Sequence, residues 1–173
     1  MFTLRTGDAG DTHRIVDLIN SAYSGDGGRA GWTHEAHLIE GERTDAAEIA
    51  GLIAAPEGRF LLCFDGAALV GCAYVRTMGG PGYLGMLAVR PALQGGGVGK
   101  LLLAEGERII HEEWGCASAL ISVFTSHRPE LSAFYERRGY VRTGRTKPLL
   151  RDAQDVKVEG LGLEWMEKRF AAT

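Results

Sequence analysis

One short segment constrains the fold of this chain more than any other: a glycine-rich stretch, residues 94–100, that joins two apolar segments. Residues 83–89 before it are strand-like, and residues 101–110 after it are helix-like. Glycine lets the backbone turn sharply and direct several N–H groups toward one point. The first turn of a helix adds unpaired N–H groups and the positive end of the helix dipole. Such a strand–loop–helix unit predicts a binding site for a phosphate or pyrophosphate.

Two well-known phosphate-binding loops do not fit this stretch. A Walker A loop requires glycine where this chain has Gln94, and serine or threonine where it has Leu101. The dinucleotide pattern Gly-x-Gly-x-x-Gly would require glycine at Lys100 or Leu102. A turn without any ligand is disfavoured because ordering so many glycines loses much chain entropy. The spacing that fits is Gln-x-x-Gly-x-Gly, formed by Gln94, Gly97 and Gly99.

A second pattern occurs near residue 135. Residues 131–140 read as an amphipathic helix that carries Tyr135, ends at Gly139 and is followed by the aromatic Tyr140. Taken alone, Tyr135 would be interpreted as a tyrosine at the edge of the core.

Together, the glycine loop, the tyrosine helix and their separation resemble the two signatures of the GNAT superfamily of N-acetyltransferases. The resemblance covers residues 2–170 and is weak between residues 24 and 43. It implies an α/β fold with a mixed sheet of about seven strands and four helices, in a single domain over residues 1–173. It also implies acetyl-CoA as cosubstrate and no metal.

The resemblance assigns roles to individual residues. Backbone groups of the strand before the loop would pair with the pantetheine arm, and one of their N–H groups would polarise the thioester carbonyl. The loop would hold the pyrophosphate, with Lys100 and Arg90 near the other phosphates. Tyr135 would protonate the departing CoA thiolate, since a phenol is neutral at pH 7 and can donate a proton. The expected cofactor-binding residues are Leu87, Ala88, Val89, Gln94, Gly95, Gly96, Gly97, Val98, Gly99, Lys100 and Tyr135.

Two departures from the family pattern leave the general base unassigned. Many relatives carry an asparagine at the position of Arg128, and a glutamate on the fourth strand, where residues 83–86 offer no carboxylate. The acidic, glycine-containing segment 24–43 is the expected acceptor-binding region, with Trp32 as an apolar anchor. Glu35 is the first carboxylate expected as catalytic base or amine anchor, although a water molecule could serve, and a solvated acidic loop explains these residues equally well.

Turn and capping signals order the remaining elements. Asp65-Gly66 predicts a hairpin between residues 59–64 and 67–75. Asp45 and Glu48 read as an N-cap and capping-box pair for a helix that ends near Pro56. The sequence therefore predicts a strand, two helices, three strands, a helix, a strand, a helix and two strands. The other expected elements are strands at 2–6, 119–124, 140–146 and 161–168, and helices through 15–23 and from 129 to 139.

Composition narrows the function classes. Hydrophobic residues make up 45% of the chain and the net charge is −3, which is typical of a globular protein and argues against general nucleic-acid binding. No apolar run is long enough to cross a bilayer, the N-terminus lacks a signal-peptide layout, and three scattered cysteines suggest reduced thiols in the cytoplasm. His34 and His37 are three residues apart, one short of the zincin spacing, so a metal site is not expected.

The function predicted from the sequence is transfer of an acetyl group from acetyl-CoA to a primary amine of a small molecule or peptide. Direct attack in a ternary complex is expected, because no cysteine occupies a nucleophile position. The alternative is a non-catalytic acyl-CoA-binding module with a regulatory or sensor role. The acceptor and the oligomeric state, including a homodimer, stay open.

Overall fold

A computed structural model describes residues 1–23, 44–124, 129–147 and 163–172. Within these residues the order of elements is the one that the sequence predicts, with seven strands and four α-helices. The strands are β1 (Phe2–Thr6), β2 (Gly58–Asp65), β3 (Ala68–Thr77), β4 (Gly82–Val89), β5 (Ser118–Phe124), β6 (Val141–Lys147) and β7 (Leu163–Arg169). The α-helices are α1 (Thr12–Tyr23), α2 (Ala46–Ala54), α3 (Val98–Arg108) and α4 (Pro129–Glu136).

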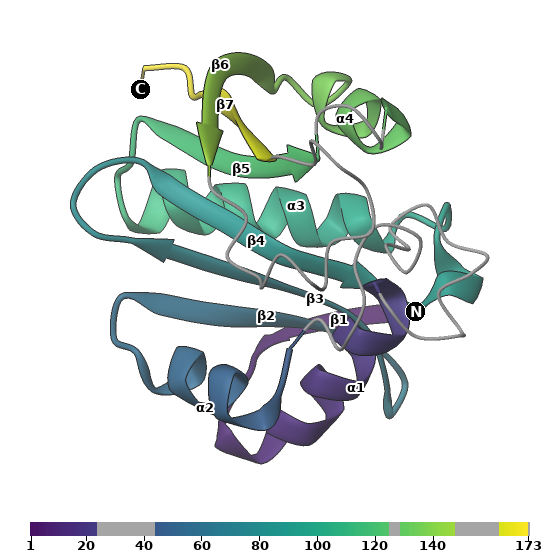
Figure 1. Cartoon of the computed structure of the whole chain (residues 1–173). Helices are drawn as coiled ribbons and strands as arrows, with labels where there is room; N and C mark the ends of the chain where they lie inside the picture. The colour runs from purple at the N-terminus through teal and green to yellow at the C-terminus, as the bar shows by residue number, and fades with distance from the viewer. Residues whose placement is uncertain (24–43, 125–128, 148–162, 173) are drawn as a thin grey trace, which may run out of the picture.

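All seven strands belong to one mixed sheet with the order β1-β2-β3-β4-β5-β7-β6. Strands β1 to β4 form an antiparallel meander, and β4 pairs with β5 in parallel. The ladder between β4 and β5 comprises only two residue pairs, Gly82↔Ala119 and Tyr83↔Leu120. Beyond them the two strands diverge toward their carboxyl ends, as Figure 1 shows.

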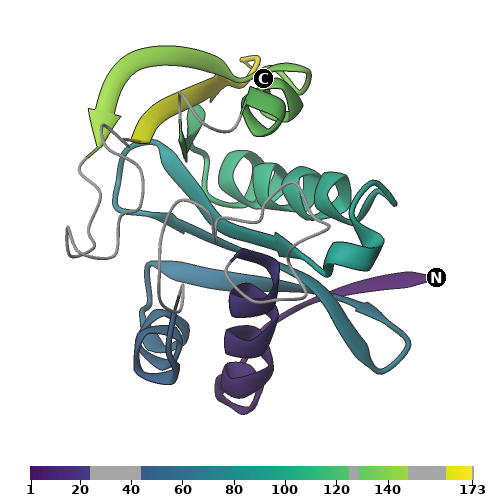
Figure 2. The same cartoon turned by 45° about the vertical axis from the view of Figure 1, so that its right-hand side comes forward.

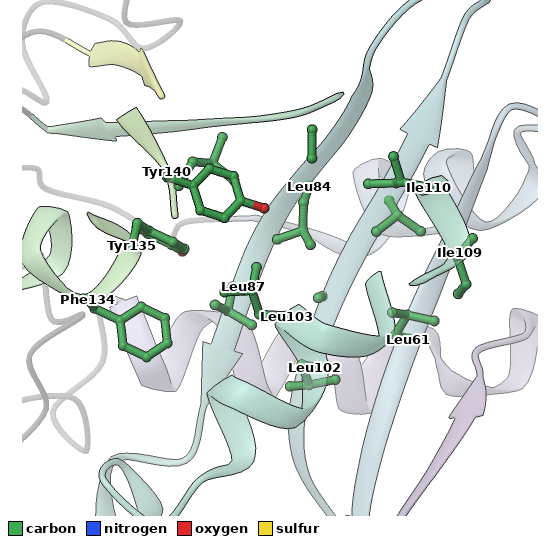
Figure 3. Close-up of a cluster of buried hydrophobic side chains, with 14 of the residues drawn as sticks. Leu61, Leu84, Leu87, Leu102, Leu103, Ile109, Ile110, Phe134, Tyr135 and Tyr140 are labelled. Carbon is green, nitrogen blue, oxygen red and sulfur yellow. The ribbon is translucent and has the colours of Figure 1, made fainter. Parts of the chain in front are cut away.

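Helices cover both faces of the sheet. Helices α1 and α2 lie on one face and α3 and α4 on the other (Figures 1 and 2). The apolar residues that recur at helical spacing in α1 are fully buried, as the sequence predicts: Ile15, Leu18, Ile19 and Ala22. A separate hydrophobic core lies between the sheet and helices α3 and α4. It includes Leu102 and Leu103 of α3 and Phe134 of α4, which are drawn in Figure 3.

Local signals in the sequence account for most element boundaries. The hairpin between β2 and β3 turns at Gly66, whose φ of 62° is in the left-handed region. The Asp45 side chain accepts a hydrogen bond from the Glu48 N–H and caps α2, while the Glu48 carboxylate accepts one from the Thr44 hydroxyl.

The start of α3 differs from the prediction. The expected helix begins at residue 101, where the apolar pattern begins, but α3 begins at Val98. Gly97 adopts a left-handed conformation as the residue before the helix, so the helix can start at once and includes Gly99. At its other end α3 continues into a π-helical turn, Ile109–Glu113. The glycine stretch is therefore part loop and part first helical turn.

Candidate active site

The structure contains a cavity of about 290 Å³ at the point where the glycine loop meets α3 and α4. Its walls come from the end of β4, the loop, the first turn of α3, and α4 with the residues that follow it. None of the described residues that line it carries a carboxylate. They are Leu87, Val89, Gln94, Gly95, Gly97, Gly99, Lys100, Leu131, Phe134, Arg137 and Arg138.

Internal hydrogen bonds define the path of the loop. The chain leaves β4 through a 3₁₀ turn, Pro91–Leu93, and the Gln94 side chain donates back to the Val89 carbonyl over 3.1 Å. Gly95 and Gly97 both have φ of 93°, a conformation that L side chains rarely adopt. These two positions explain why the loop requires glycine.

The N-terminus of α3 opens toward the cavity without a capping side chain. The Leu101 N–H donates to the Gly97 carbonyl over 3.0 Å, which begins the helical hydrogen-bond pattern. The amides of residues 98–100 precede it, and the first amides of a helix have no partner within the helix. Together with the helix dipole, they make this end of α3 electropositive, which favours an anion.

Strand β4 contributes two apolar side chains to the cavity. A register irregularity with β3 falls between Cys72 and Tyr74, and on β4 it includes Met86, which has φ of 48°. Leu87 and Val89 then line the cavity, whereas Ala88 packs in the core on the α1 side of the sheet. This alternation is the expected period of a strand.

Tyr135 is buried in the core next to the cavity. Its ring lies between those of Phe134 and Tyr140, with centroid distances of 5.2 and 5.8 Å, and points from α4 toward β4 (Figure 3). Burial raises the pKa of its phenol well above the usual range, so the hydroxyl stays protonated at neutral pH. Phe134 and Leu131 line the cavity, but Tyr135 is not among its lining residues.

The structure brings together most of the residues expected to bind the cofactor. Leu87, Val89, Gln94, Gly95, Gly97, Gly99 and Lys100 line the cavity. The Val98 side chain is instead buried in the core, and Gly96 donates its N–H to the Leu93 carbonyl. Arg90 does not extend toward the cavity, because its Nε donates to the Leu69 carbonyl on β3 over 3.1 Å. Glu35, Trp32, Arg128, His34 and His37 lie outside the described residues.

Sequence reasoning missed the contribution of the tyrosine helix to the cavity. Leu131, Phe134 and Arg138 recur at helical spacing on α4 and its C-terminal end, and Arg137 lies beside them. An amphipathic pattern by itself indicates only that Leu131 and Phe134 face the core. Only the packing of α4 beside the loop shows that the same face also forms a wall of the cavity.

The cysteines do not contribute to the cavity. Cys63, Cys72 and Cys116 are all buried, and none lines the cavity. Burial raises the pKa of the Cys72 thiol to about 12 and also raises that of Cys63. In the part of the chain that the structure describes, no group of three or more His, Cys, Asp or Glu side chains could hold a metal ion. None of the described helices is long and apolar enough to span a membrane.

The fold of this chain is similar to that of solved N-acetyltransferase structures. A search of curated proteins by sequence finds no match. The chain is similar in structure to the ribosomal-protein-S18-alanine N-acetyltransferase of Escherichia coli, with a TM-score of 0.73, 15% identity, and 100% of this chain and 96% of that one covered. It is also similar to the PaiA N-acetyltransferase of Thermoplasma acidophilum in complex with coenzyme A (TM-score 0.68, 16% identity, 98% and 99% covered).

A third similar structure is YncA, a putative acetyltransferase of Salmonella typhimurium with its cofactor acetyl-CoA (TM-score 0.69, 18% identity, 99% and 95% covered). At these identities the likeness concerns the fold, which is the mixed sheet with four helices that the resemblance implied. Residues 56–142 of the 173, from β2 to the start of β6, match the model of the acetyltransferase (GNAT) domain. The chain belongs to the GNAT acetyltransferase family.

Proposed function

We propose that this GNAT acetyltransferase, acting as one domain over residues 1–173, transfers the acetyl group of acetyl-CoA to a primary amine by direct attack in a ternary complex. The observation that carries this proposal is the uncapped N-terminus of α3, with its glycine loop, open to a cavity whose described lining residues include no carboxylate. A pyrophosphate is the chemistry that such an end favours.

The geometry of β4 supports a place for the pantetheine arm. The β4–β5 ladder ends at Tyr83, and Leu87 and Val89 line the same cavity as the loop. A ligand with its pyrophosphate at the loop would therefore run along the end of β4. In that position a backbone N–H of residues 87–89 polarises the thioester carbonyl, as a donor aimed at the developing negative charge.

Tyr135 is the proposed general acid. As the amine nitrogen attacks the thioester carbon, the carbon–sulfur bond breaks and the thiolate takes a proton from the phenol. The phenol is protonated at neutral pH, and burial raises its pKa further, so the proton is present when the thiolate leaves. The location of Tyr135 between Phe134 and Tyr140, beside the cavity wall, supports this role.

Direct transfer is favoured because the thiols of the chain are unsuited to form an acyl-enzyme. Each of the three is buried away from the cavity, and a nucleophilic cysteine has to be an accessible thiolate. The base that takes the proton of the attacking amine is proposed to be Glu35 or a water molecule. The acidic composition of segment 24–43 supports a cationic acceptor.

The proposal is tested by measuring free thiol released from acetyl-CoA in the presence of a panel of amines, alongside calorimetric binding of acetyl-CoA. The panel comprises polyamines, amino acids, aminoglycosides, peptides with free N-termini and peptides with internal lysine. Amine-dependent release of one thiol per acetylated product supports the transferase. Tight binding with no turnover on any amine would instead favour an acyl-CoA-binding sensor.

A further inference from the structure

Arg76, near the end of β3, is a half-buried cation without a carboxylate to balance it. It lies opposite Tyr83 of β4 in the register of the two strands. Its guanidinium is 5.1 Å from the centre of the Tyr83 ring, and Nη1 donates to the Met78 sulfur over 3.8 Å. Among the described residues Arg76 forms no ion pair with an acidic side chain, in contrast to Arg59 and Arg108. Most of its N–H donors are therefore available to a ligand.

Two aromatic rings fix the orientation of this guanidinium. Tyr83 packs edge to face against Trp165 of β7, with ring centroids 5.6 Å apart, and both side chains are half-buried. An arginine that stacks on a ring loses little further freedom on binding, and its planar fork matches the two oxygens of a carboxylate. Arg76 is therefore preorganised to bind a carboxylate.

Arg76 and Tyr83 lie on the face of the sheet opposite to the cavity. Leu84, the next residue after Tyr83, packs in the core between the sheet and α3. Because side chains alternate along a strand, Tyr83 points to the other face. Gly85 shares that face with Tyr83, is exposed, and has no atom within 4 Å of its Cβ position. The sheet is therefore open beside the aromatic pair.

Tyr83 also marks the point where β4 and β5 part. It forms the last residue pair of their ladder, with Leu120, and the strands diverge beyond it (Figure 1). In the proposed complex the pantetheine arm runs back along β4 from the glycine loop, so the thioester approaches this point from the cavity side. The amine has to reach the thioester from the face that the cofactor leaves open, which is the face of Arg76.

We propose that Arg76 binds a carboxylate of the acceptor, and that the acceptor is an amine that also carries a carboxylate, such as an amino acid or a short peptide with a free C-terminus. This inference rests on the proposed function, since it names the class of its acceptor. The ammonium group of such an acceptor suits the acidic composition of segment 24–43, and its carboxylate suits Arg76. The two signals together describe a zwitterion.

The test compares acceptors with and without the carboxylate. Each amino acid and peptide of the amine panel is paired with its carboxamide, for example L-phenylalanine with L-phenylalaninamide and L-lysine with L-lysinamide. Acetylation by the full chain is followed as thiol released from acetyl-CoA. For the acceptors that the wild type uses, kcat/KM should be about 10-fold or more higher for the carboxylate form, mainly through KM, as expected for a charge-assisted contact.

Arg76→Gln should raise KM for the carboxylate form by about that factor, leave KM for the carboxamide nearly unchanged, and preserve the calorimetric affinity for acetyl-CoA. Arg76→Lys should keep part of the preference, because it retains the charge without the planar fork.

Arg59→Gln is the matched control. Arg59 also lies over a ring, 5.6 Å from the centre of Trp114, but it pairs with Glu113. It is two residues from Leu61, which packs in the core on the α3 side, so its side chain belongs to the opposite face of the sheet from Arg76. Its loss should change KM for neither form, and thermal unfolding confirms that each variant folds.

Three results separate this inference from the proposed function. Equal kcat/KM for the two members of every pair, or an equal loss for both in Arg76→Gln, overturns the carboxylate site and leaves the acetyltransferase proposal standing. Turnover of polyamines or aminoglycosides, but of no amine that carries a carboxylate, has the same meaning. Binding of acetyl-CoA without turnover of any amine overturns both.

Discussion

At the scale of single residues, two neighbouring buried tyrosines differ in their surroundings: one lies beside the cavity and the other joins two elements of the fold. Tyr135 and Tyr140 pack edge to face, and burial raises the pKa of both phenols. The Tyr140 hydroxyl donates to Glu107 of α3 over 3.0 Å, and Lys168 of β7 donates to the other oxygen of the same carboxylate over 2.8 Å. Tyr140 therefore connects α3 to β7, whereas Tyr135 lies beside the cavity wall.

Tyr135→Phe should lower kcat by about 100-fold or more, because the proposed acid supplies the proton for the leaving thiolate. The affinity for acetyl-CoA should change little, since the hydrogen bond from the Tyr135 hydroxyl to the thiolate forms mainly in the transition state. Steady-state kinetics measure the change in kcat. Pre-steady-state experiments establish whether the chemical step limits the rate. Tyr140→Phe is the control: it should lower stability and preserve kcat. A Tyr135→Phe enzyme with full kcat for the chemical step would leave Tyr135 as a core tyrosine.

Asp11 makes folding stability depend on acid pH. Its carboxylate accepts two hydrogen bonds from the Arg5 guanidinium, at 2.8 and 2.9 Å, and one from the Asp8 N–H at 2.9 Å. These donors, the Arg5 guanidinium foremost, lower the pKa of Asp11 from 3.8 to about 2, against an opposing effect of burial. The pair connects β1 to the turn that precedes α1.

Because the folded pKa lies below the unfolded one, the stabilisation is complete above pH 4 to 5 and is lost as pH falls toward about 2. Asp11→Asn should therefore lower the free energy of unfolding by on the order of 2 kcal/mol at pH 7. The difference from wild type should shrink toward zero near pH 2, measured by urea unfolding at a series of pH values. Asp17→Asn, on the exposed face of α1, is the control. A difference that is constant between pH 7 and pH 2 would contradict this assignment.

At the scale of elements, the loop and the first turn of α3 work as one unit. Gly95 and Gly97 supply the left-handed backbone, while Gly99 has an ordinary helical backbone and lines the cavity. A Cβ at Gly99 would meet only Phe134 and Val89, at 3.7 and 3.9 Å, which is normal van der Waals contact. A larger side chain there would extend into the cavity without backbone strain.

Gly99→Leu should fold with a melting temperature close to that of the wild type, yet bind acetyl-CoA at least about 10-fold more weakly, because the side chain blocks approach to the amides of α3. Gly51 is an exposed residue of α2 with no atom near its Cβ position, so Gly51→Leu makes the same chemical change in another helix and should leave affinity unchanged. Calorimetry and thermal unfolding separate the two effects. Unchanged affinity in a folded Gly99→Leu variant would refute the loop as the phosphate site.

At the scale of the whole molecule, the position of the site depends on how closely α3 approaches the sheet. Gly71 of β3 lies directly under the start of α3: a Cβ there would be 2.7 Å from Val98 Cγ1 and 2.9 Å from Leu102 Cδ1. Gly82 of β4 makes a similar close approach, to Ile110. The glycines of the sheet thus set the depth at which the N-terminal end of α3 is held.

Gly71→Ala should lower the free energy of unfolding by about 1–3 kcal/mol, as overpacking of a core does. It should also weaken acetyl-CoA binding, because the first turn of α3 has to shift. Urea unfolding and calorimetry give the two quantities. Gly80→Ala, in the turn between β3 and β4 with nothing near its Cβ position, should change neither. Destabilisation without any change in affinity would show that the helix end keeps its position.

The sequence by itself determined the features that depend on near neighbours in the chain. The Asp65-Gly66 hairpin, the Asp45 cap of α2, the buried face of α1 and the glycine loop after β4 all follow from local backbone and periodicity rules, and the structure confirms them. The onset of α3 at Val98 was mispredicted because a left-handed Gly97 leaves no mark in the apolar pattern.

Only the tertiary structure decided what depends on contacts between distant segments. The insertion of β7 between β5 and β6 has no local signature, since strand pairing is set by packing across the whole sheet. The same holds for the cavity: β4, the loop and the start of α3 are far in sequence from α4 and the residues after it, and only their packing makes Lys100 and Arg137 line one cavity. Local rules can assign a residue to a helix, but the charges it faces come from the elements packed against it.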